Sequence, residues 1–580
     1  MKLKVIVPLS LLAFFSMSSC SCSSNQNNSG GVPSGISVSL PSEMSEPEIT
    51  GAFSILDSNN QVVSPSGSVY TLSSGGSYTA TGFLEEGQII VSAGDNDNVE
   101  LVLEGAKITN STDSPIMALT GNKLEVKAKS GYSNLIKDLR AEKTIDLESV
   151  GEGAIHSKID LKFTGQGTLI SKSSYSSGIH CTKDVEIQNL ILEANGVHNA
   201  IKGKDSITVT SGTITLFSSK GQGLKTVNSD KSSSGNQRGT ITINGGSVGI
   251  NTCYDAIDAS YDVKIAQADS SVSTTVGAYT AKNSSYSANY DGSSSAKGLK
   301  ANNLIDISAG DIVISAGDDA IHANYGTTLG NGTTGLGNIV IAGGSIGIAS
   351  GDDGIHADNT VTISGGTIQI SNATEGIESN HLNISGGQTY IYGSDDGVNA
   401  SKKINETPSI EISGGFLDIS VSGNDVDGID SNGSYTQSGG LVISRGSTGS
   451  QVGLSTALDC DGEASISGGT FIAFNGVEKA PSRGSSVLYA GTFSEGSSEG
   501  QVPPGGGSGH HPRATLNASY SSGTYKLSGG DMDITFANNY DYSTFCVYSS
   551  LLKKGTSYTL SKDDSTLLSW SQSSDSQVIS

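Results

Sequence analysis

Apolar and polar positions follow one repeated order between about residues 205 and 475 of this chain. Each copy has an isoleucine, a Gly-Gly turn, a second apolar segment and then a corner of the form acid-Gly-Ile. Three consecutive copies start at Ile341, Ile363 and Ile384, which are 22 and 21 residues apart. A period of this length with short β segments is typical of a solenoid, in which every repeat stacks on its neighbours.

Within each segment the apolar positions alternate with polar ones, as in Ile368-Gln369-Ile370. Because successive side chains of a strand point to opposite faces, this alternation turns the isoleucines inward. Stacked in register about 4.8 Å apart, the isoleucines of successive copies form apolar columns. We therefore predict an all-β fold, a right-handed parallel β-helix (a solenoid) with about 20–25 residues per turn.

The regular repeats occupy only part of the chain. Strand-like segments before residue 150 lack a clear period, and the end of a solenoid needs a cover because it exposes strand edges. After about residue 485 the period stops, and a Pro/Gly-rich linker precedes a few hairpin-like segments. The predicted organisation is a signal peptide at 1–19, a flexible tether at 20–49, an N-terminal cap with irregular first turns at 50–150, the regular parallel β-helix with acidic corners at 151–484, and a linker with a small C-terminal β cap at 485–580.

The N-terminus has the features of a bacterial lipoprotein signal peptide. Lys2 and Lys4 precede the apolar run Val5–Phe15, which is too short to span a membrane. Cys20 follows small residues and is expected to carry a lipid anchor, with simple secretion as the alternative. We predict an extracytoplasmic lipoprotein of the bacterial cell envelope, at the cell surface or outer membrane, that contacts the membrane through this anchor alone.

The net charge of the chain limits the classes of partner that it can bind. The formal net charge is −24, from 57 acidic and 33 basic residues. Phosphate binding needs basic patches, so nucleic acid is excluded as a partner. Cations, or ligands that are held through cations, fit this balance better.

The acid at each corner keeps a constant offset from the preceding isoleucine, so stacking the turns also stacks the carboxylates. Carboxylates about 5 Å apart repel by roughly 1 kcal/mol per pair at high dielectric, unless they take up protons or bind cations. Oxygen ligands in a flexible arrangement favour Ca²⁺ over Mg²⁺ or Zn²⁺. The predicted calcium ligands are Asp255, Asp258, Asp318, Asp319, Asp352, Asp353, Asp358, Glu375, Asp395, Asp396, Asp427 and Asp430.

A second interpretation of the corners is that Asp and Asn serve only to make Asx turns. This interpretation accounts for single acids better than for doubled ones, because the second acid gains nothing from a turn. The corner histidines are not clustered with cysteines, and we expect stacked surface residues rather than zinc ligands: His156, His180, His322 and His356.

The segments Gly351–Asp358 and Ile363–Ile370 resemble a bacterial family of secreted carbohydrate-binding β-helix proteins, and residues 212–216, 295–301 and 552–560 are similar to it too. The likeness covers roughly residues 90–580. It implies a calcium-binding right-handed β-helix, similar in shape to pectate lyases, that binds acidic or cellulose-like plant polysaccharides. On this resemblance the metal role falls on the doubled acids Asp318-Asp319, Asp352-Asp353 and Asp395-Asp396, with Asp358 as a neighbour; at Glu375 the preceding residue is Thr374, which departs from the doubled pattern.

Two other functions stay open. A calcium-dependent polysaccharide lyase needs a base, commonly arginine, and no arginine lies in an acidic corner, although Lys225 and Lys300 do. A structural or adhesive surface protein would use calcium only to stiffen the solenoid. Because the acids repeat over several turns, we favour a binding array over one active site. We predict a monomeric, calcium-dependent carbohydrate-binding protein for acidic or plant cell-wall polysaccharide, with no catalytic residues and with Tyr390 and Tyr392 as a sugar-stacking face.

Overall fold

The computed structural model describes part of the chain, namely residues 3–6, 39–142, 152–330, 332–424, 426–447, 455–478, 481–483, 486–490, 492–494, 513–515, 520–542 and 544–579. Cys20, most of the predicted signal peptide and tether, and the Pro/Gly-rich linker lie outside the described residues. The chain divides into two compact units. The first unit is Ser37–Ile346, and the second unit is Gly347–Ser580 together with Met1–Ile36.

Each turn of the first unit contains three short strands. One turn consists of β10 (Gly153–Ser157), β11 (Asp160–Gly165) and β12 (Thr168–Ser173). The next turn pairs with it in parallel, with Ile155 beside Ile179. The predicted all-β parallel β-helix is confirmed, but the repeat has three strands where the sequence pattern indicated two. The additional strand is the corner itself, because the apolar residue after the corner glycine already belongs to a parallel ladder.

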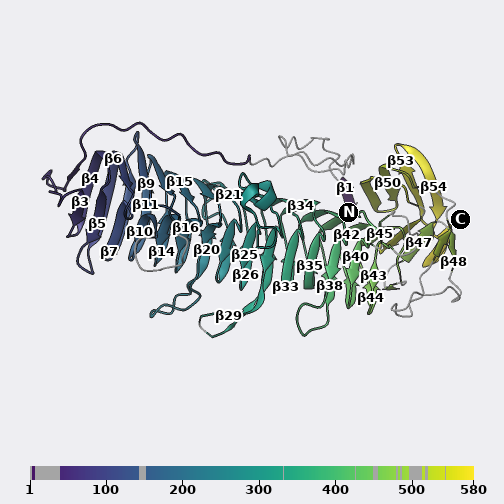
Figure 1. Ribbon diagram of the computed structural model, residues 1–580. Coiled ribbons are helices and arrows are strands. Elements are labelled where there is room, and N and C mark those ends of the chain that lie inside the picture. The colour runs from purple at the N-terminus through teal and green to yellow at the C-terminus, as the bar shows by residue number, and fades with distance from the viewer. Residues whose placement is uncertain are drawn as a thin grey trace. The chain divides into compact units, whose positions relative to one another are not determined.

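The first strands of successive turns, named here the corner strands, form one parallel ladder (Figure 1). In the first unit they are β3 (Val69–Leu72), β5 (Gln88–Ser92), β7 (Ile116–Thr120), β10, β13 (Ser177–Cys181), β16 (Asn199–Gly203), β19 (Gln222–Lys225), β22 (Ile257–Ala259), β25 (Leu299–Ala301) and β28 (Ile321–Ala323). Parallel pairing thus already begins at β3, within the residues predicted to form the cap and the irregular turns.

Two further ladders complete the turns of the first unit. The second ladder contains β4 (Gly76–Leu84), β6 (Asn98–Asn110), β8 (Lys123–Ala128), β11, β14 (Asp184–Ile187), β17 (Ser206–Val209), β20 (Thr240–Ile243), β23 (Asp262–Ile265), β26 (Leu304–Ile307) and β31 (Asn338–Ile341). The third contains the end of β6, β9 (Ser133–Asp138), β12, β15 (Ile191–Gly196), β18 (Thr213–Ser218), β21 (Gly246–Thr252), β24 (Thr274–Thr280) and β27 (Asp311–Ser315). Elements outside the ladders are β2 (Ser54–Leu56), the 3₁₀ turns η1 (Ala281–Asn283) and η2 (Ser287–Asn289), and the hairpin of β29 (Tyr325–Thr328) and β30 (Thr334–Leu336).

The core of the coil consists of columns of aliphatic side chains. Ile243, Ile265, Ile307 and Ile341 follow one another in parallel register, and all four are fully buried. Burying such a side chain contributes about 1.5–3 kcal/mol relative to leaving it exposed, so the columns provide much of the cohesion between turns. The apolar columns predicted from the isoleucine spacing are confirmed.

The N-terminal segment at 39–50 lies along the first unit, where Figure 1 draws it in dark purple. Ion pairs join Glu46 to Lys137 at 2.8 Å and Glu43 to Lys172 at 2.9 Å. Nδ2 of Asn251 donates to the carbonyl oxygen of Pro41 at 3.4 Å. This part of the predicted tether is therefore held against the coil.

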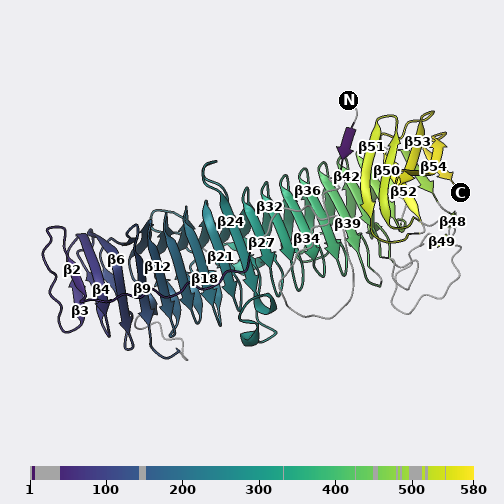
Figure 2. The same ribbon diagram turned by 90° about the horizontal axis from the view of Figure 1, so that it is seen from above.

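The second unit repeats the three-strand turn, and Figure 2 shows its third ladder from above. Its corner strands are β33 (Ile355–Ile363), β35 (Ile377–Ile384), β37 (Val398–Ala400), β40 (Ile429–Ser431) and β43 (Asp459–Cys460). The second ladder contains the ends of β33 and β35, then β38 (Ser409–Ile412), β41 (Ser434–Gln437), β44 (Ala464–Ile466) and β46 (Ser482–Arg483). The third ladder contains β34 (Thr367–Asn372), β36 (Gln388–Gly393), β39 (Phe416–Val421), β42 (Leu441–Arg445) and β45 (Thr470–Phe474). The chain passes from one unit to the other within β32 (Ser345–Ala349).

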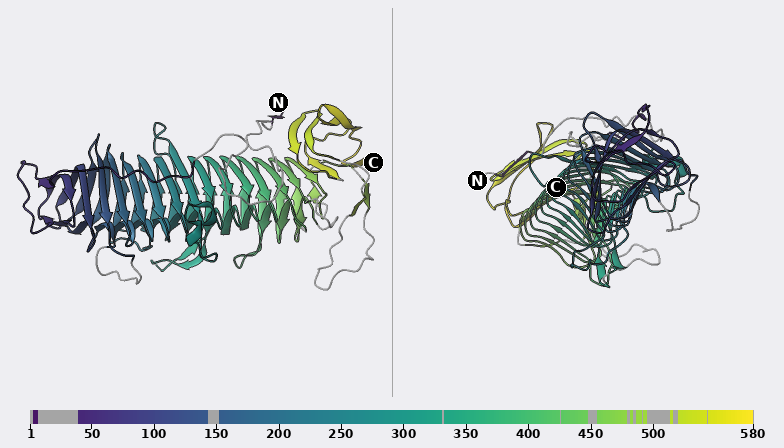
Figure 3. Two further views of the ribbon diagram at one scale, coloured as in Figure 1. Left: turned by 45° about the horizontal axis from the view of Figure 1, so that its top comes forward. Right: turned by 90° about the vertical axis from the view of Figure 1, so that its left-hand side faces the viewer.

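The last turn of the second unit is covered by antiparallel strands, drawn in yellow-green to yellow in Figure 3. Strand β45 pairs with β52 (Phe545–Ser549), and β52 pairs in turn with β47 (Ser486–Ala490), which pairs with β55 (Ser576–Ile579). A separate sheet contains β1 (Leu3–Ile6), β51 (Met532–Asn538), β50 (Gly523–Gly529), β53 (Ser557–Lys562) and β54 (Ser565–Ser571), and β48 (Thr492–Ser494) pairs with β49 (Arg513–Thr515). Such a cover protects the last parallel strand from pairing with another chain.

The cover is fixed by one buried cation and an aromatic core. The guanidinium of Arg445 is fully buried, forms an ion pair with Asp418 and donates from Nε to Oδ1 of Asn538 at 3.0 Å. Phe474 of the coil packs among Tyr525 and other aromatic residues of the C-terminal strands. Among the residues that the structure describes, no helix is long and apolar enough to cross a membrane.

Candidate functional site

In the first unit the corner carboxylates are interrupted by lysine. The amide of Ala256, next to Asp255, donates to the carbonyl of Lys297, so the turn after Asp255 carries a lysine at its corner. Nζ of Lys297 lies 3.0 Å from Oδ1 of Asp318 and 2.6 Å from Oδ2 of Asp319. A basic corner thus stands between acidic ones in this unit and neutralises the acids of its neighbour.

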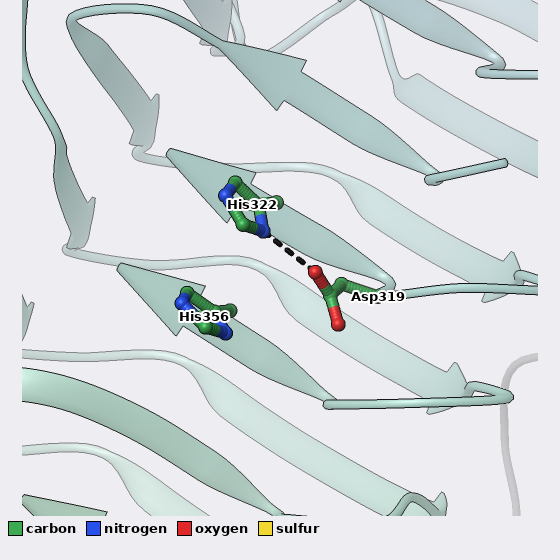
Figure 4. Close-up of side chains that lie close together, drawn as sticks. All are labelled: Asp319, His322 and His356. Carbon is green, nitrogen blue, oxygen red and sulfur yellow. Dashed lines mark hydrogen bonds and ion pairs between the residues drawn. The ribbon is translucent and has the colours of Figure 1, made fainter. Parts of the chain in front are cut away.

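The other predicted ligands of this unit also lie beside cationic or basic groups. Lys225 and Asp258 form an ion pair at 2.5 Å, and Lys300 lies 3.4 Å from Oδ2 of Asp255. Nδ1 of His322, on β28, lies 2.6 Å from Oδ2 of Asp319 (Figure 4). Although burial raises it, the hydrogen bond from His322 and the ion pair with Lys297 hold the pKa of Asp319 below its usual range. These four acids are thus largely compensated without a metal ion.

In several corner acids, one carboxylate oxygen accepts a hydrogen bond from a backbone amide of the next turn. The acceptors and donors are Asp255 Oδ1 and the amide of Lys297 at 2.8 Å, Asp353 Oδ1 and the amide of Glu375 at 3.2 Å, Asp396 Oδ1 and the amide of Asp427 at 2.7 Å, and Asp427 Oδ1 and the amide of Thr456 at 2.5 Å. An Asx turn would instead bond within its own turn. At these corners the acid ties one turn to the next, which leaves its second oxygen for other partners.

In the second unit the corner acids stack without interruption. The amides of Gly354, Gly376 and Gly397 donate to the carbonyls of Glu375, Asp396 and Asp427. Three residues further along, Glu378, Asn399, Asp430 and Asp459 follow one another in register. The stacking of carboxylates predicted from the constant offset is confirmed for this unit. We name as the acid ladder the residues Glu375, Glu378, Asp396, Asp427, Asp430 and Asp459.

Burial makes this ladder electrostatically costly. It raises the pKa of Asp396 and of Asp427 to about 8 and that of Asp430 to about 7, and the neighbouring carboxylates add to the rise. Burial and the charge of Glu378 also raise the pKa of Glu375. For Glu378 itself, hydrogen bonds from His356 and Lys403 outweigh burial and lower the pKa. Glu375, Asp396 and Asp427 therefore hold protons at neutral pH, and Asp430 is about half protonated, unless a cation replaces the protons.

Three buried oxygen atoms of these turns have no hydrogen-bond partner within the part of the chain that the structure describes. They are Oε2 of Glu375, Oδ1 of Asn399 and Oδ1 of Asp459. Nδ2 of Asn399 donates to the other oxygen of Glu375 at 2.8 Å, which fixes both side chains. A buried acceptor without a partner costs about 1–3 kcal/mol. Oxygen donors with no nitrogen or sulfur among them suit a hard divalent cation such as Ca²⁺.

Asn399 and Asp459 were absent from the predicted ligands. Both lie three residues past a corner position, where Glu378 and Asp430 stand in neighbouring turns. Asp352 and Asp395, the first acids of two doubled corners, are exposed, whereas Asp427 is buried with 9% of its surface accessible. The signal that identifies the missed residues is thus the register three positions after the corner, rather than the doubling of the acid.

The histidines differ from the surface residues that the sequence analysis predicted. His156 and His180 are buried, and their Nδ1 atoms lie 3.0 Å apart. Nδ1 of His356 lies 2.8 Å from Asp353 and 3.0 Å from Glu378, and Nε2 lies 3.4 Å from Asp358. The prediction is wrong for the first two residues: although His180 stands in register with Lys202, the two imidazole rings pack against each other with centroids 4.9 Å apart, and His180 also contacts Glu152. Asp353 and Asp358, two predicted calcium ligands, contact this imidazole.

The two predicted sugar-stacking tyrosines are half-buried. The ring of Tyr390 lies 5.5 Å from that of Phe416, and burial raises the pKa of its hydroxyl to about 12. The hydroxyl of Tyr392 lies 2.7 Å from Oγ of Ser422. Their role in sugar binding stays a prediction.

The first unit contains a polar cavity of about 390 Å³ over its corner strands, which the sequence analysis did not predict. Lys225, Lys300, Asp258 and Tyr254 line it, together with Ser294 and Ser295 of an insert. The insert is the Ser/Asn/Tyr-rich stretch between β24 and β25, and it includes η1 and η2. Its serines thus form a wall of a cavity on the coil.

The fold and these corners define a parallel β-helix protein with stacked polar corner strands. A family described as "Carbohydrate-binding domain-containing protein" matches residues 66–338 and 328–481, which together are more than half of the chain. The chain therefore belongs to this family of carbohydrate-binding domain-containing proteins.

One relative and one solved structure are similar to this chain. One, from Acetivibrio thermocellus, is also described as a carbohydrate-binding domain-containing protein and is 30% identical over 113 residues, 19% of this chain. The matched part spans 40% of that relative's length. A solved structure, described as the polysaccharide lyase-like protein from C. thermocellum, gadolinium derivative, is 28% identical with a TM-score of 0.34. The likeness covers 37% of this chain and 84% of that one.

Proposed function

We propose that this chain is a calcium-dependent polysaccharide-binding protein of the bacterial cell envelope, and that it recognises acidic plant cell-wall glycans. Membership of the carbohydrate-binding family supports the glycan. The observation that carries the calcium requirement is the acid ladder, whose buried and half-buried carboxyls repel one another and whose turns hold three unpartnered oxygens.

Calcium would be held by carboxylate and amide oxygens of neighbouring turns. Glu375 and Asn399 supply unpartnered atoms in adjacent turns, and Asp459, in register with Asp430, supplies one further along the ladder. The exposed carboxylate of Asp395 lies next to Asp396, at the solvent side of the ladder. When bound, the cation supplies positive charge that both the ladder and an acidic polysaccharide can share.

The binding function is favoured over a lyase by the state of the two corner lysines. A lysine that acts as a base has to lose its proton. Lys225 forms an ion pair with Asp258, and Lys300 lies beside Asp255. Both ammonium groups are therefore already engaged by carboxylates of the chain itself. We therefore propose no catalytic residue.

The cellular location is part of the proposal. The lysines and apolar run before Cys20 support export and lipid attachment at that cysteine. The protein would then present a monomeric coil outside the cytoplasm. Metabolic labelling with a palmitate analogue should label the wild-type chain and leave Cys20→Ala unlabelled; equal labelling of both would refute the anchor.

Calorimetric titration of polygalacturonate into the chain from Ser23 onward tests the function. We expect binding heat with calcium and its loss with EDTA. The double variant Asp396→Asn/Asp427→Asn should lose this heat, whereas Glu411→Gln, an exposed acid on β38, should keep it.

Equal binding in calcium and EDTA would contradict the calcium requirement. During the same titration, ultraviolet absorbance is followed for an unsaturated uronate product. A rise would make the protein a lyase. No heat and no product would leave a structural or adhesive role, or a neutral glycan.

A further inference from the structure

The cavity of the first unit lies over three corner strands, β19, β22 and β25, and under the insert that carries Ser294 and Ser295. Its volume of about 390 Å³ falls in the range of small-ligand sites, about 300–1,000 Å³. Its lining is polar, with lysine, aspartate, serine and glutamine side chains around one tyrosine. Such a lining suits a ligand rich in hydroxyl groups.

Lys220, Lys225 and Lys300 line the cavity, although the chain as a whole carries a net charge of −24. Lys225, Asp258 and Lys300 occupy the same position in three successive corner strands, so one acid stands between two ammonium groups. Nζ of Lys225 lies 2.5 Å from Oδ2 of Asp258. Nζ of Lys300 lies 3.4 Å from Oδ2 of Asp255 and equally far from Oγ of Ser295, at the limit of a hydrogen bond. Lys300 is thus loosely held and can turn to an anionic ligand.

One aromatic ring, that of Tyr254, lines the cavity. Tyr254 packs edge-on against Tyr290 of the insert, with ring centroids 6.1 Å apart. Its hydroxyl lies 3.5 Å from Oδ2 of Asp291, which the amides of Ser293 and Ser294 fix in turn. The tyrosine is therefore positioned by the insert, and an aromatic ring beside hydroxyl donors is a surface on which a sugar ring packs.

We propose that this cavity binds one uronate residue of an acidic polysaccharide directly, with the sugar carboxylate between Lys225 and Lys300 and no metal ion. The inference rests on the proposed polysaccharide-binding function and adds a second mode of recognition to it. Ammonium–carboxylate hydrogen bonds are roughly twice as strong as neutral ones, so the lysines would select an acidic sugar over a neutral sugar. Asp258 competes with the ligand for Lys225.

The competition predicts opposite effects for the lysine variants and for the aspartate variant. Lys225→Gln and Lys300→Gln remove a contact to the ligand, and each should raise the Kd for trigalacturonate about tenfold or more. Asp258→Asn releases Lys225 and should lower the Kd several-fold. Lys202→Gln is the matched control, because Lys202 pairs in register with Lys225 but does not line the cavity, and its Kd should equal that of the wild type.

The measurement is calorimetry with trigalacturonate in EDTA on the full chain from Ser23 onward, with galactotriose as the neutral probe. Gain in Asp258→Asn together with loss in the lysine variants supports the proposal, and a variant that merely misfolds cannot produce the gain. Unchanged binding in both lysine variants, or weaker binding in Asp258→Asn, overturns it. Tight binding of galactotriose overturns the acidic-sugar assignment.

The failure of this proposal is distinguishable from failure of the proposed function. If trigalacturonate shows no binding in EDTA while polygalacturonate binds with calcium, the uronate cavity is refuted and the calcium-dependent function stands. If neither glycan binds under either condition, both are refuted.

Discussion

Replacing Asp427 by asparagine is expected to stabilise the calcium-free protein at alkaline pH. The carboxyl is buried and its folded-state pKa is about 8, whereas an unfolded aspartate has a pKa of about 3.9. Between these values the folded state holds a proton that the unfolded state has lost, so the free energy of unfolding falls as pH rises from about 4 to about 8. Below about pH 4 both states are protonated, and the penalty vanishes.

The size of the effect follows from the separation of the two pKa values. About four units at about 1.4 kcal/mol each give a penalty on the order of 5 kcal/mol once the group is ionised. Asparagine removes the charge and keeps an oxygen that can accept from the amide and the hydroxyl of Thr456, as Asp427 does at 2.5 and 2.9 Å. For a unit of this size the Tm changes by about 2–4 °C per kcal/mol, so Asp427→Asn should raise the Tm by at least about 10 °C.

The assay is thermal unfolding in EDTA at about pH 5.5 and about pH 8.5, repeated with calcium. We expect the wild-type Tm to fall between the two pH values in EDTA, and Asp427→Asn to fall less and to melt higher at the alkaline pH. With calcium the wild type should recover, and the variant should recover less because it has lost a ligand. Glu411→Gln, which changes an exposed acid, should follow the wild type. A lower Tm for Asp427→Asn in EDTA at about pH 8.5, or a wild-type Tm independent of pH, would refute the reasoning.

Three further predictions concern stability. Lys297→Gln removes the cation between two carboxylates and should cost about 3–5 kcal/mol in EDTA, with partial recovery in calcium; denaturant unfolding measures both. Arg445→Met leaves Asp418 without its partner and should cost a similar amount, read from the loss of the C-terminal aromatic near-ultraviolet signal; an unchanged signal would contradict it. Gly397→Ala should lower the Tm, because a Cβ there would lie 2.6 Å from the carbonyl oxygen of Gly428; differential scanning fluorimetry that shows no loss would argue against this close approach.

The fold was predictable because the residues that repeat along the sequence are the buried ones. Isoleucines such as Ile243 and Ile307 must recur at one phase for their columns to close, and the structure places them in register and fully buried. The corner strand of each turn was missed because its apolar pattern begins only after the corner glycine and is too short to give a period-2 signal. Strand pairing between β45 and β52 joins residues far apart in sequence, which no local pattern reveals.

The acids of the second unit were predicted, but their chemical difference from those of the first unit was not. The same spacing rule produced Asp319 and Asp396, and only the structure shows that Lys297 stands beside the former. Lys297 lies within a long insert-bearing interval, where the repeat is stretched and the corner carries no acid. Asp459 was missed because its corner, Thr456-Ala457-Leu458, carries no acid, although Asp258 and Asp430 at the same position of other turns were predicted.

One position of the repeat therefore sets the charge that a turn offers to a ligand. Three residues past the corner, the first unit has Lys225 and Lys300 around Asp258, while the second unit has Glu378 and Asp430. The backbone hydrogen bonds of these turns are alike, so exchanging this side chain changes the ligand preference and leaves the strand pairing in place. Lysine there favours an anionic sugar bound directly, and an acid favours a cation that a glycan can share. For that reason Asp258→Asn should strengthen binding of a short uronate without calcium, whereas Asp427→Asn should weaken binding of a long one with calcium. If both substitutions changed affinity in the same direction, a single mode of binding would replace the two proposed.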